Sequence, residues 1–107
     1  MAKIVNVTTV RFDAVVTGRD ELVLVDLWSP DCVPCRTLLP ILEDLAVDFA
    51  GEVAVYKVDV AAEPELHTRL GIRGVPTLAL YRDGQEVDRI LGLRSRSELS
   101  RWIEGHL

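Results

Sequence analysis

Hydrophobic residues follow two patterns along this chain. Short continuous apolar runs are typical of strands inside a sheet, and apolar residues that recur every three or four positions are typical of amphipathic helices. The runs predict strands over residues 4–7, 22–28, 53–60, 77–81 and 87–91. The second pattern predicts helices that start at Thr8 or Thr9 and stop at Gly18, that start at Pro34, and that cover residues 63–70 and 95–107.

The order of these elements predicts one mixed sheet. It reads βαβαβ followed by ββα, which implies a parallel half joined to an antiparallel half, with helices on both faces. Residues 22–28 are apolar on both alternating faces, as expected of a strand in the middle of that sheet. Arg82-Asp83-Gly84-Gln85 carries the Asp-Gly signal of a hairpin turn. We therefore expect one α/β domain over residues 1–107, long enough to bury a core.

Composition and charge narrow the classes of protein. The chain is 49% hydrophobic and 27% charged, as ordinary globular proteins are. Its net charge of −5 argues against nucleic acid as a partner, because phosphate binding needs clustered Lys and Arg. No apolar stretch approaches the roughly 20 residues that span a bilayer. Residues 1–6 lack the apolar core of a signal peptide, although a leader removed earlier would leave no trace. We expect a cytoplasmic protein and, since no segment indicates an interface, a monomer.

The two cysteines, Cys32 and Cys35, lie three residues apart, between the apolar run 22–28 and a predicted helix. Residues at this spacing are neighbours on one helix face, with Cα atoms roughly 5 Å apart. A disulfide requires about 4.4–6.8 Å. So short a loop gains only about 2 kcal/mol from the bond, and structural disulfides are rare in the cytosol. The pair therefore indicates a redox site that opens and closes with little backbone movement.

The two cysteines are expected to have different roles. Cys32 falls at the N-terminus of the helix, where free N–H groups and the helix dipole favour a thiolate, so it is the predicted nucleophile. Cys35 lies one turn deeper and is predicted to resolve the mixed disulfide. A zinc site and an inert buried pair are the alternatives. Two cysteines supply half of a zinc site, and His67 and His106 lack the spacing of further ligands, so we expect no metal.

Asp26 is a carboxylate among six apolar residues of the predicted central strand. Burial makes ionisation costly, so the pKa of Asp26 is expected to rise unless a cation compensates. Lys57, in the neighbouring predicted strand, is the candidate partner. The functional interpretation is a buried base that accepts the proton of Cys35, and the alternative is an edge strand with Asp26 facing water. Pro76, just before another predicted strand, suggests a special backbone position.

Taken together, these residues resemble the thioredoxin family, and the resemblance covers essentially the whole chain. It is carried by Val25-Asp26-Leu27-Trp28, Cys32-Val33-Pro34-Cys35, Pro40, Lys57-Val58-Asp59, Gly71-Ile72-Arg73-Gly74-Val75-Pro76-Thr77, Asp83-Gly84 and Gly92. The resemblance implies a thioredoxin fold, in which a central five-stranded mixed β-sheet is flanked by four α-helices. It also implies a cytosolic enzyme that reduces protein disulfides without a bound cofactor, and that receives electrons from NADPH through thioredoxin reductase.

The resemblance further implies a substrate-binding surface beside the dithiol. Pro76 is expected to follow a cis peptide bond, and the backbone of Val75 is expected to pair with the substrate strand. The other residues of this surface are Trp28, Val33, Pro34, Gly74 and Gly92.

Two positions depart from the Trp-Cys-Gly-Pro-Cys that is usual in the family: Asp31 replaces the Trp and Val33 replaces the Gly. The charge of Asp31 is expected to raise the pKa of Cys32, or its carboxylate to cap the helix and compete for the same N–H groups. Either effect makes Cys32 a weaker nucleophile. Val33 adds a stiff branched group at the rim of the docking surface. We expect these changes to affect recognition more than the basic chemistry.

The leading interpretation is a thiol–disulfide oxidoreductase that reduces protein disulfides through Cys32 and Cys35. One alternative is a specialised protein of the same kind that serves a dedicated partner. A second is a binding module on the same fold whose redox activity is incidental, in which case Cys32→Ser leaves function intact. A third is a disulfide oxidase or isomerase, which is disfavoured because Asp31 is expected to destabilise the reduced state and because the sequence shows no sign of a secretory leader.

Overall fold

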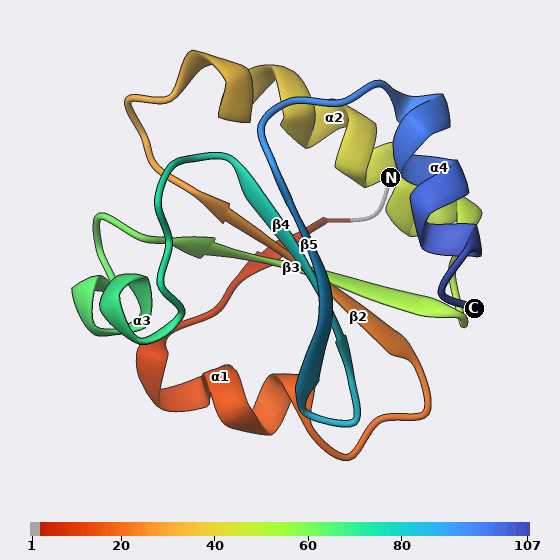
Figure 1. Cartoon of the computed structure of the whole chain (residues 1–107), viewed down its shortest axis with the longest axis horizontal. Coiled ribbons are helices and arrows are strands. Elements are labelled where there is room, and N and C mark those ends of the chain that lie inside the picture. Colours follow the sequence, from red (N-terminus) through yellow and green to blue (C-terminus); the bar gives the residue numbers. More distant parts are fainter. Residues whose placement is uncertain (1–2) are drawn as a thin grey trace.

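The computed structural model describes residues 3–107, which form five strands and four helices (Figure 1). The strands are β1 (Val5–Asn6), β2 (Leu22–Trp28), β3 (Val53–Asp59), β4 (Thr77–Arg82) and β5 (Gln85–Leu91). The helices are α1 (Thr9–Val16), α2 (Val33–Asp48), α3 (Pro64–Arg69) and α4 (Arg96–Glu104). Over these residues, no helix has the length and apolar character needed to cross a membrane.

The sheet has the strand order β1-β3-β2-β4-β5, with β2 in the middle. β1 and β2 run parallel to β3, whereas β4 runs antiparallel to β2 and to β5. Thr77 of β4 pairs with Leu27 of β2 on one side and with Leu91 of β5 on the other. The last residues of β2 and β5 and the first residues of β4 therefore meet at one end of the sheet.

Two hydrophobic cores lie on opposite faces of this sheet. Helices α2 and α4 cover one face, and α1 and α3 cover the other (Figure 1). Because side chains alternate along a strand, β2 supplies both cores: Leu22 and Leu24 belong to one, and Val23 and Val25 to the other. The predicted mixed sheet with helices on both faces is confirmed.

Two sequence predictions about elements need correction. The sequence predicts a buried strand over residues 53–60, but residues 54–57 of β3 are only half-buried. The reason is that β3 is the second strand from the sheet edge, and its outer neighbour β1 consists of two exposed residues. The predicted closing helix reaches Leu107, whereas α4 ends at Glu104 and has Gly105 as its C-cap. Glycine is a poor helix former, which accounts for the earlier end.

The N-terminus of α1 is held by a contact that the sequence does not indicate. Thr8 occupies the N-cap position, but its side chain makes no capping hydrogen bond. Instead, the backbone N–H and the hydroxyl of Thr9 both donate to Oε1 of Glu63, at 2.6 and 2.9 Å. These bonds lower the pKa of Glu63 and fix α1 to the segment before α3. At the other end, Gly18 has a φ of 70°, as expected for the residue that stops the helix.

The predicted hairpin between β4 and β5 is confirmed. Asp83 and Gly84 occupy the turn with φ values of 51° and 84°. Positive φ at both central residues defines the type I′ turn that Asp-Gly favours between antiparallel strands. A Cβ at Gly84 would also come within 2.9 Å of the hydroxyl oxygen of Thr17, so this position has two reasons to be glycine.

Helix α4 begins with a capping box. The hydroxyl of Ser95 accepts a hydrogen bond from the N–H of Glu98 at 3.2 Å, and Oε1 of Glu98 accepts one from the N–H of Ser95 at 3.4 Å. We expect Ser95→Ala to lower the free energy of unfolding by about 1 kcal/mol, measured by urea denaturation of the oxidised protein. Ser95→Thr keeps an acceptor and should retain most of the stability. Equal stability of Ser95→Ala and wild type would show that the capping box contributes nothing.

Candidate active site

The two cysteines lie where β2 ends and α2 begins. A disulfide joins them, with Cα atoms 5.2 Å apart, so the predicted pairing is confirmed. Cys32 and Cys35 are both buried, with 8% and 4% of their surface exposed, which makes Cys32 the slightly more accessible. Within residues 3–107, no cluster of three His, Cys, Asp or Glu side chains is placed to hold a metal ion. The two sulfur atoms are bonded to each other.

Cys32 occupies the N-cap position of α2. Its Sγ accepts a hydrogen bond from the backbone N–H of Cys35 at 3.1 Å. Pro34 in the same turn has no N–H of its own. A thiolate on Cys32 would be stabilised by the Cys35 N–H and by the dipole of the helix. The alternative in which Asp31 caps the helix is wrong, because Asp31 precedes the cap residue and lies exposed at the surface.

Asp26 lies in the interior, with 1% of its surface exposed. The edge-strand alternative is wrong, because β2 pairs with β3 on one side and with β4 on the other. Within the described residues, Oδ1 of Asp26 has no hydrogen-bond partner. Burial raises the pKa of Asp26 to about 7, against the opposing effect of the positive charge of Lys57. A carboxyl group with such a pKa can both accept and release a proton near neutral pH.

Lys57 is paired with Asp26 in the register of β2 and β3. Across residues 3–107, no ion pair or hydrogen bond joins the two side chains, so Lys57 acts on the carboxylate through its charge. The Nζ of Lys57 lies 5.3 Å from the ring centroid of Trp28, and Nε1 of Trp28 donates to Oδ1 of Asn6 at 3.0 Å. Sequence reasoning misses Asn6, because an exposed asparagine in a two-residue strand carries no signal.

One small pocket of about 80 Å³ connects the buried carboxylate with the dithiol. Its lining residues are Asp26, Trp28, Cys35, Arg36, Leu39 and Lys57. Sequence reasoning misses Arg36 and Leu39, although the helical spacing of Cys35 and Leu39 would place them on one face. The guanidinium of Arg36 donates to the carbonyl of Pro30 at 2.9 Å and so fastens the loop that leads to the dithiol.

The segment before β4 reaches the same end of the sheet. The peptide bond between Val75 and Pro76 is cis, as the resemblance implies. The hydroxyl of Thr77 donates to the carbonyl of Gly74 at 2.6 Å, and the N–H of Gly92 donates to the carbonyl of Pro76 at 2.8 Å. Gly92 has a φ of 97°, which favours glycine. These bonds hold Gly74, Pro76 and Gly92 together beside the end of β2, with which β4 is paired.

The first turn of α2 presents the two remaining residues of the expected docking surface. Val33 is 61% exposed, and Pro34 is exposed beside it. Trp28 and Val75 are half-buried. All seven residues of that surface therefore come from the ends of β2 and β5, the segment before β4, and the start of α2.

Comparison with known proteins agrees with this arrangement. The family model described as Thioredoxin matches residues 3–105. The chain is 36% identical over 107 residues to Thioredoxin 1 of Nostoc sp., with both chains covered completely. It is 37% identical over 102 residues to Thioredoxin of Rickettsia bellii, covering 95% of this chain and 97% of the other. It is 36% identical over 104 residues to Thioredoxin of Staphylococcus aureus, covering 97% and 98%.

The matched residues include Cys32 and Cys35 and nearly all of the surrounding fold. A match of this extent to thioredoxins, together with the bonded pair, identifies a thiol–disulfide oxidoreductase of the disulfide-reductase type. The chain therefore belongs to the thioredoxin family.

Proposed function

We propose that Cys32 is the nucleophile and Cys35 the resolving residue of this protein-disulfide reductase. Two observations support these roles. Cys32 is the N-cap of α2 and accepts the N–H of Cys35, which favours a thiolate on Cys32. Cys35 lines the pocket that it shares with Asp26, and this shared pocket is the observation that carries the proposal.

The proposed cycle transfers two electrons from the dithiol to the substrate. The Cys32 thiolate attacks one sulfur of a substrate disulfide; a bond forms between them, and the other substrate sulfur leaves as a thiolate. Cys35 then loses its proton and attacks Sγ of Cys32. The mixed disulfide breaks, the second substrate sulfur leaves, and the Cys32–Cys35 bond is restored. The substrate ends as a dithiol and the enzyme as a disulfide.

We propose that the carboxylate of Asp26 accepts the proton of Cys35. Its pKa of about 7 suits this exchange, because a base is most effective when its pKa lies near the working pH. The pocket between the two residues, of about 80 Å³, has room for a water molecule that could carry the proton. Lys57, in register with Asp26, favours its ionised form. We assign Lys57 the role of limiting the rise in the pKa of Asp26, so that the ionised carboxylate is populated near neutral pH.

The docking surface is proposed to consist of two parts. The backbone of Val75 pairs with the extended substrate segment, next to Pro76 and between the glycines at 74 and 92. The bonds from Thr77 to Gly74 and from Gly92 to Pro76 support this assignment, because they fix the backbone. The other part consists of Trp28, Val33 and Pro34.

Electrons are proposed to come from NADPH through a thioredoxin reductase, and the protein is proposed to act as a monomeric, single-domain protein in the cytoplasm.

Asp31 and Val33 support a narrower range of partners than a Trp-Cys-Gly-Pro-Cys site would have. Val33 is 61% exposed, so its branched side chain meets any docking protein. Exposed aromatic residues are common anchors at interfaces, and position 31 lacks one here. A dedicated partner is therefore the second candidate.

The roles of the two cysteines can be separated by trapping. We expect wild-type protein to catalyse reduction of a model protein disulfide by dithiothreitol, and both Cys32→Ser and Cys35→Ser to abolish catalysis. Cys35→Ser should accumulate a mixed disulfide with the substrate, seen by mass spectrometry, whereas Cys32→Ser should not. The reverse pattern would exchange the two roles. Full activity of Cys32→Ser in its biological setting would favour the binding-module alternative.

Replacement of Asp26 should stabilise the fold and slow the reaction. The folded pKa of about 7 lies above the ordinary value of 3.8, so ionisation inside the protein opposes folding. This cost is absent below about pH 4, grows as the pH rises toward 7, and stays constant above it. At about 1.4 kcal/mol per unit of pKa difference, Asp26→Ala and Asp26→Asn should unfold at higher urea concentration than wild type near pH 8.

Asp26→Asn is the cleaner comparison, because it keeps the volume of the side chain and resembles the protonated acid. Its advantage over oxidised wild type should vanish near pH 4. Its reduction of a protein disulfide should be slower near neutral pH. A stability difference that does not change with pH would contradict an ionisable, buried Asp26.

The charge of Asp31 should restrain the nucleophile. We expect reduced Asp31→Asn protein to react faster than wild type with an alkylating reagent at neutral pH, because the thiolate of Cys32 no longer faces a nearby negative charge. The midpoint of its pH–rate profile should move to lower pH, and high salt should shrink the difference. Glu52→Gln removes an exposed charge at the opposite end of the sheet and serves as control. Equal profiles for Asp31→Asn and wild type would show that Asp31 does not act on Cys32.

A further inference from the structure

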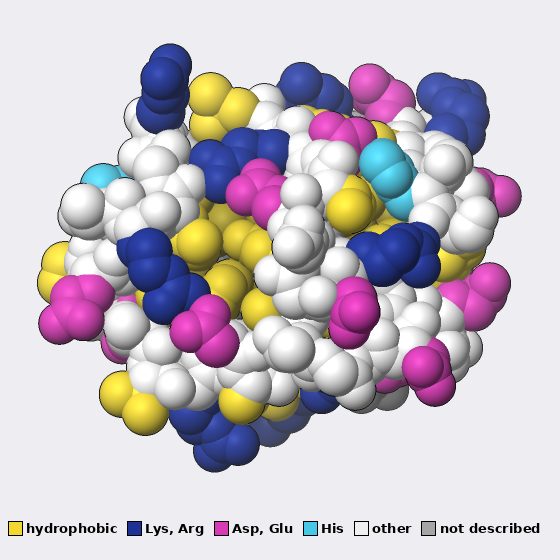
Figure 2. All heavy atoms as spheres, turned by 60° about the horizontal axis from the view of Figure 1, so that its bottom comes forward, with side chains coloured by type: hydrophobic (Ala, Val, Ile, Leu, Met, Phe, Trp, Pro, Cys, Tyr) yellow, Lys and Arg dark blue, Asp and Glu magenta, His cyan; other side chains and the backbone are white. Residues whose placement is uncertain are grey.

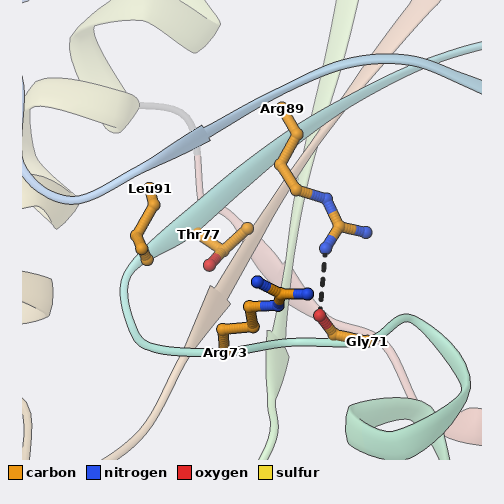
Figure 3. A pocket seen from close by; sticks show the side chains of 5 residues that line it. All are labelled: Gly71, Arg73, Thr77, Arg89 and Leu91. Carbon is orange, nitrogen blue, oxygen red and sulfur yellow. Dashed lines mark hydrogen bonds between the residues drawn. The ribbon is translucent and has the colours of Figure 1, made fainter.

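A second hollow lies beside the proposed docking surface. It measures about 280 Å³ and is lined by Gly71, Arg73, Thr77, Arg89 and Leu91. Figure 3 shows the guanidinium groups of Arg73 and Arg89 both turned toward Gly71, with Thr77 and Leu91 alongside. Two cations thus project into one hollow from different parts of the chain, the segment before β4 and strand β5.

The two arginines differ in how their charge is balanced. Arg89 is paired with Glu86, at 2.6 and 2.9 Å, and also donates to the carbonyls of Leu70 and Gly71, at 2.7 and 3.3 Å. Over residues 3–107, Arg73 has no hydrogen-bond or ion-pair partner. Glu86 therefore balances the charge of Arg89 alone, and the hollow keeps an excess positive charge on the exposed side chain of Arg73.

The location of Arg73, rather than its lack of a partner, distinguishes it from other surface arginines. Figure 2 shows cationic and anionic side chains interspersed over one face of the molecule. Several arginines have carboxylate partners, including Arg69 with Asp13 at 2.6 Å and Arg96 with Asp48 at 2.6 Å. Arg11 and Arg101 also have no acidic partner within residues 3–107, but neither lines this hollow. Arg73 combines an unpaired guanidinium with a place in a hollow beside the proposed docking surface, and this combination supports a ligand for it.

The hollow is continuous with the docking surface through Leu91. A Cβ placed on Gly74 would lie 3.4 Å from Cδ1 of Leu91, so the Leu91 side chain lies beside Gly74. Leu91 is 53% exposed and lines the hollow. Arg73 lies two residues before Val75, whose backbone is proposed to pair with the substrate. An extended peptide advances roughly 3.3 Å per residue, so its residue two places beyond that pairing would reach Arg73.

We propose that this hollow is a subsite for an acidic side chain of the protein substrate, close to the cysteine that is attacked. This inference rests on the proposed function and adds a substrate preference to it. Arg73 provides the unpaired guanidinium, which binds a carboxylate in a forked, two-point geometry. Arg89, held by Glu86, forms a fixed polar wall, and Leu91 packs against the methylene groups of the side chain. A glutamate reaches the hollow with more apolar contact than an aspartate.

The size of the preference for an acidic residue follows from the solvent exposure of Arg73. Solvent-exposed ion pairs contribute about 0.2–1 kcal/mol, which corresponds to a preference of about 1.5- to 5-fold in kcat/KM. The preference should appear mainly in KM, because the subsite touches the substrate away from the reacting sulfurs. It should also weaken with salt, as exposed charge pairs do.

The test uses disulfide peptides that differ only in the residues flanking one cysteine, with Glu, Gln or Lys at each position in turn. Wild-type protein should reduce one Glu peptide about 1.5- to 5-fold more efficiently than its Gln counterpart, and the Lys peptide least efficiently. Arg73→Gln should bring the Glu-to-Gln ratio close to one. Arg101→Gln, which removes an exposed charge from α4, is the matched control and should leave the ratio as in wild type.

The outcomes separate the inference from the function on which it rests. Reduction of all peptides by wild type with equal efficiency would overturn the subsite and leave the reductase function intact. A Glu preference that persists in Arg73→Gln would place acid recognition elsewhere and would equally overturn the subsite. If wild-type protein is folded and forms its own disulfide but reduces none of the peptides, that result would count against both the subsite and the reductase function.

Discussion

The alternation of side chains along β2 sets the geometry of the whole active site. Leu22 and Leu24 face the core beneath α2 and α4, and the next position on that face is Asp26. Because β2 has a hydrogen-bonded strand on each side, the carboxylate cannot turn to water at a sheet edge. The same strand ends at Trp28, from which a short loop leads to the N-cap of α2. One strand thus places a buried acid and a dithiol around one pocket.

The burial of Asp26 lowers the stability of the fold but gives the carboxyl group a pKa suited to proton exchange. A leucine at position 26 would continue the core, whereas a carboxylate there loses hydration and leaves Oδ1 without a partner among the described residues. A close ion pair with Lys57 would relieve that cost, but it would also hold the carboxylate ionised and lower its affinity for a proton. Lys57 instead attracts the carboxylate without an ion pair, and the pKa of Asp26 stays near 7. Partial compensation therefore preserves the ability to exchange a proton.

Local sequence signals predict the parts of this molecule that local physics determines. The apolar run of β2, the Asp-Gly hairpin and the cysteine spacing all depend on residues close together in the chain, and the structure confirms them. The contacts that sequence reasoning misses join distant positions. Glu63 holds α1 through Thr9, and Asn6 receives the indole of Trp28. The partial burial of β3 likewise depends on its place beside the exposed edge strand β1. No periodicity or motif encodes such pairings, because they arise only when the chain has folded.

The charges around the dithiol act at different ranges, and this affects how substrates are selected. The net charge of −5 repels an acidic partner at a distance. Screening limits the attraction of Arg73 to about 8 Å at physiological ionic strength, so this residue acts only after a substrate has docked near Leu91. An acidic residue should therefore not speed encounter, but it should prolong the bound state once formed. Asp31 is proposed to act on the enzyme's own reacting group, the Cys32 thiol. The subsite would then govern how long a substrate stays, and Asp31 how readily the bound disulfide is attacked.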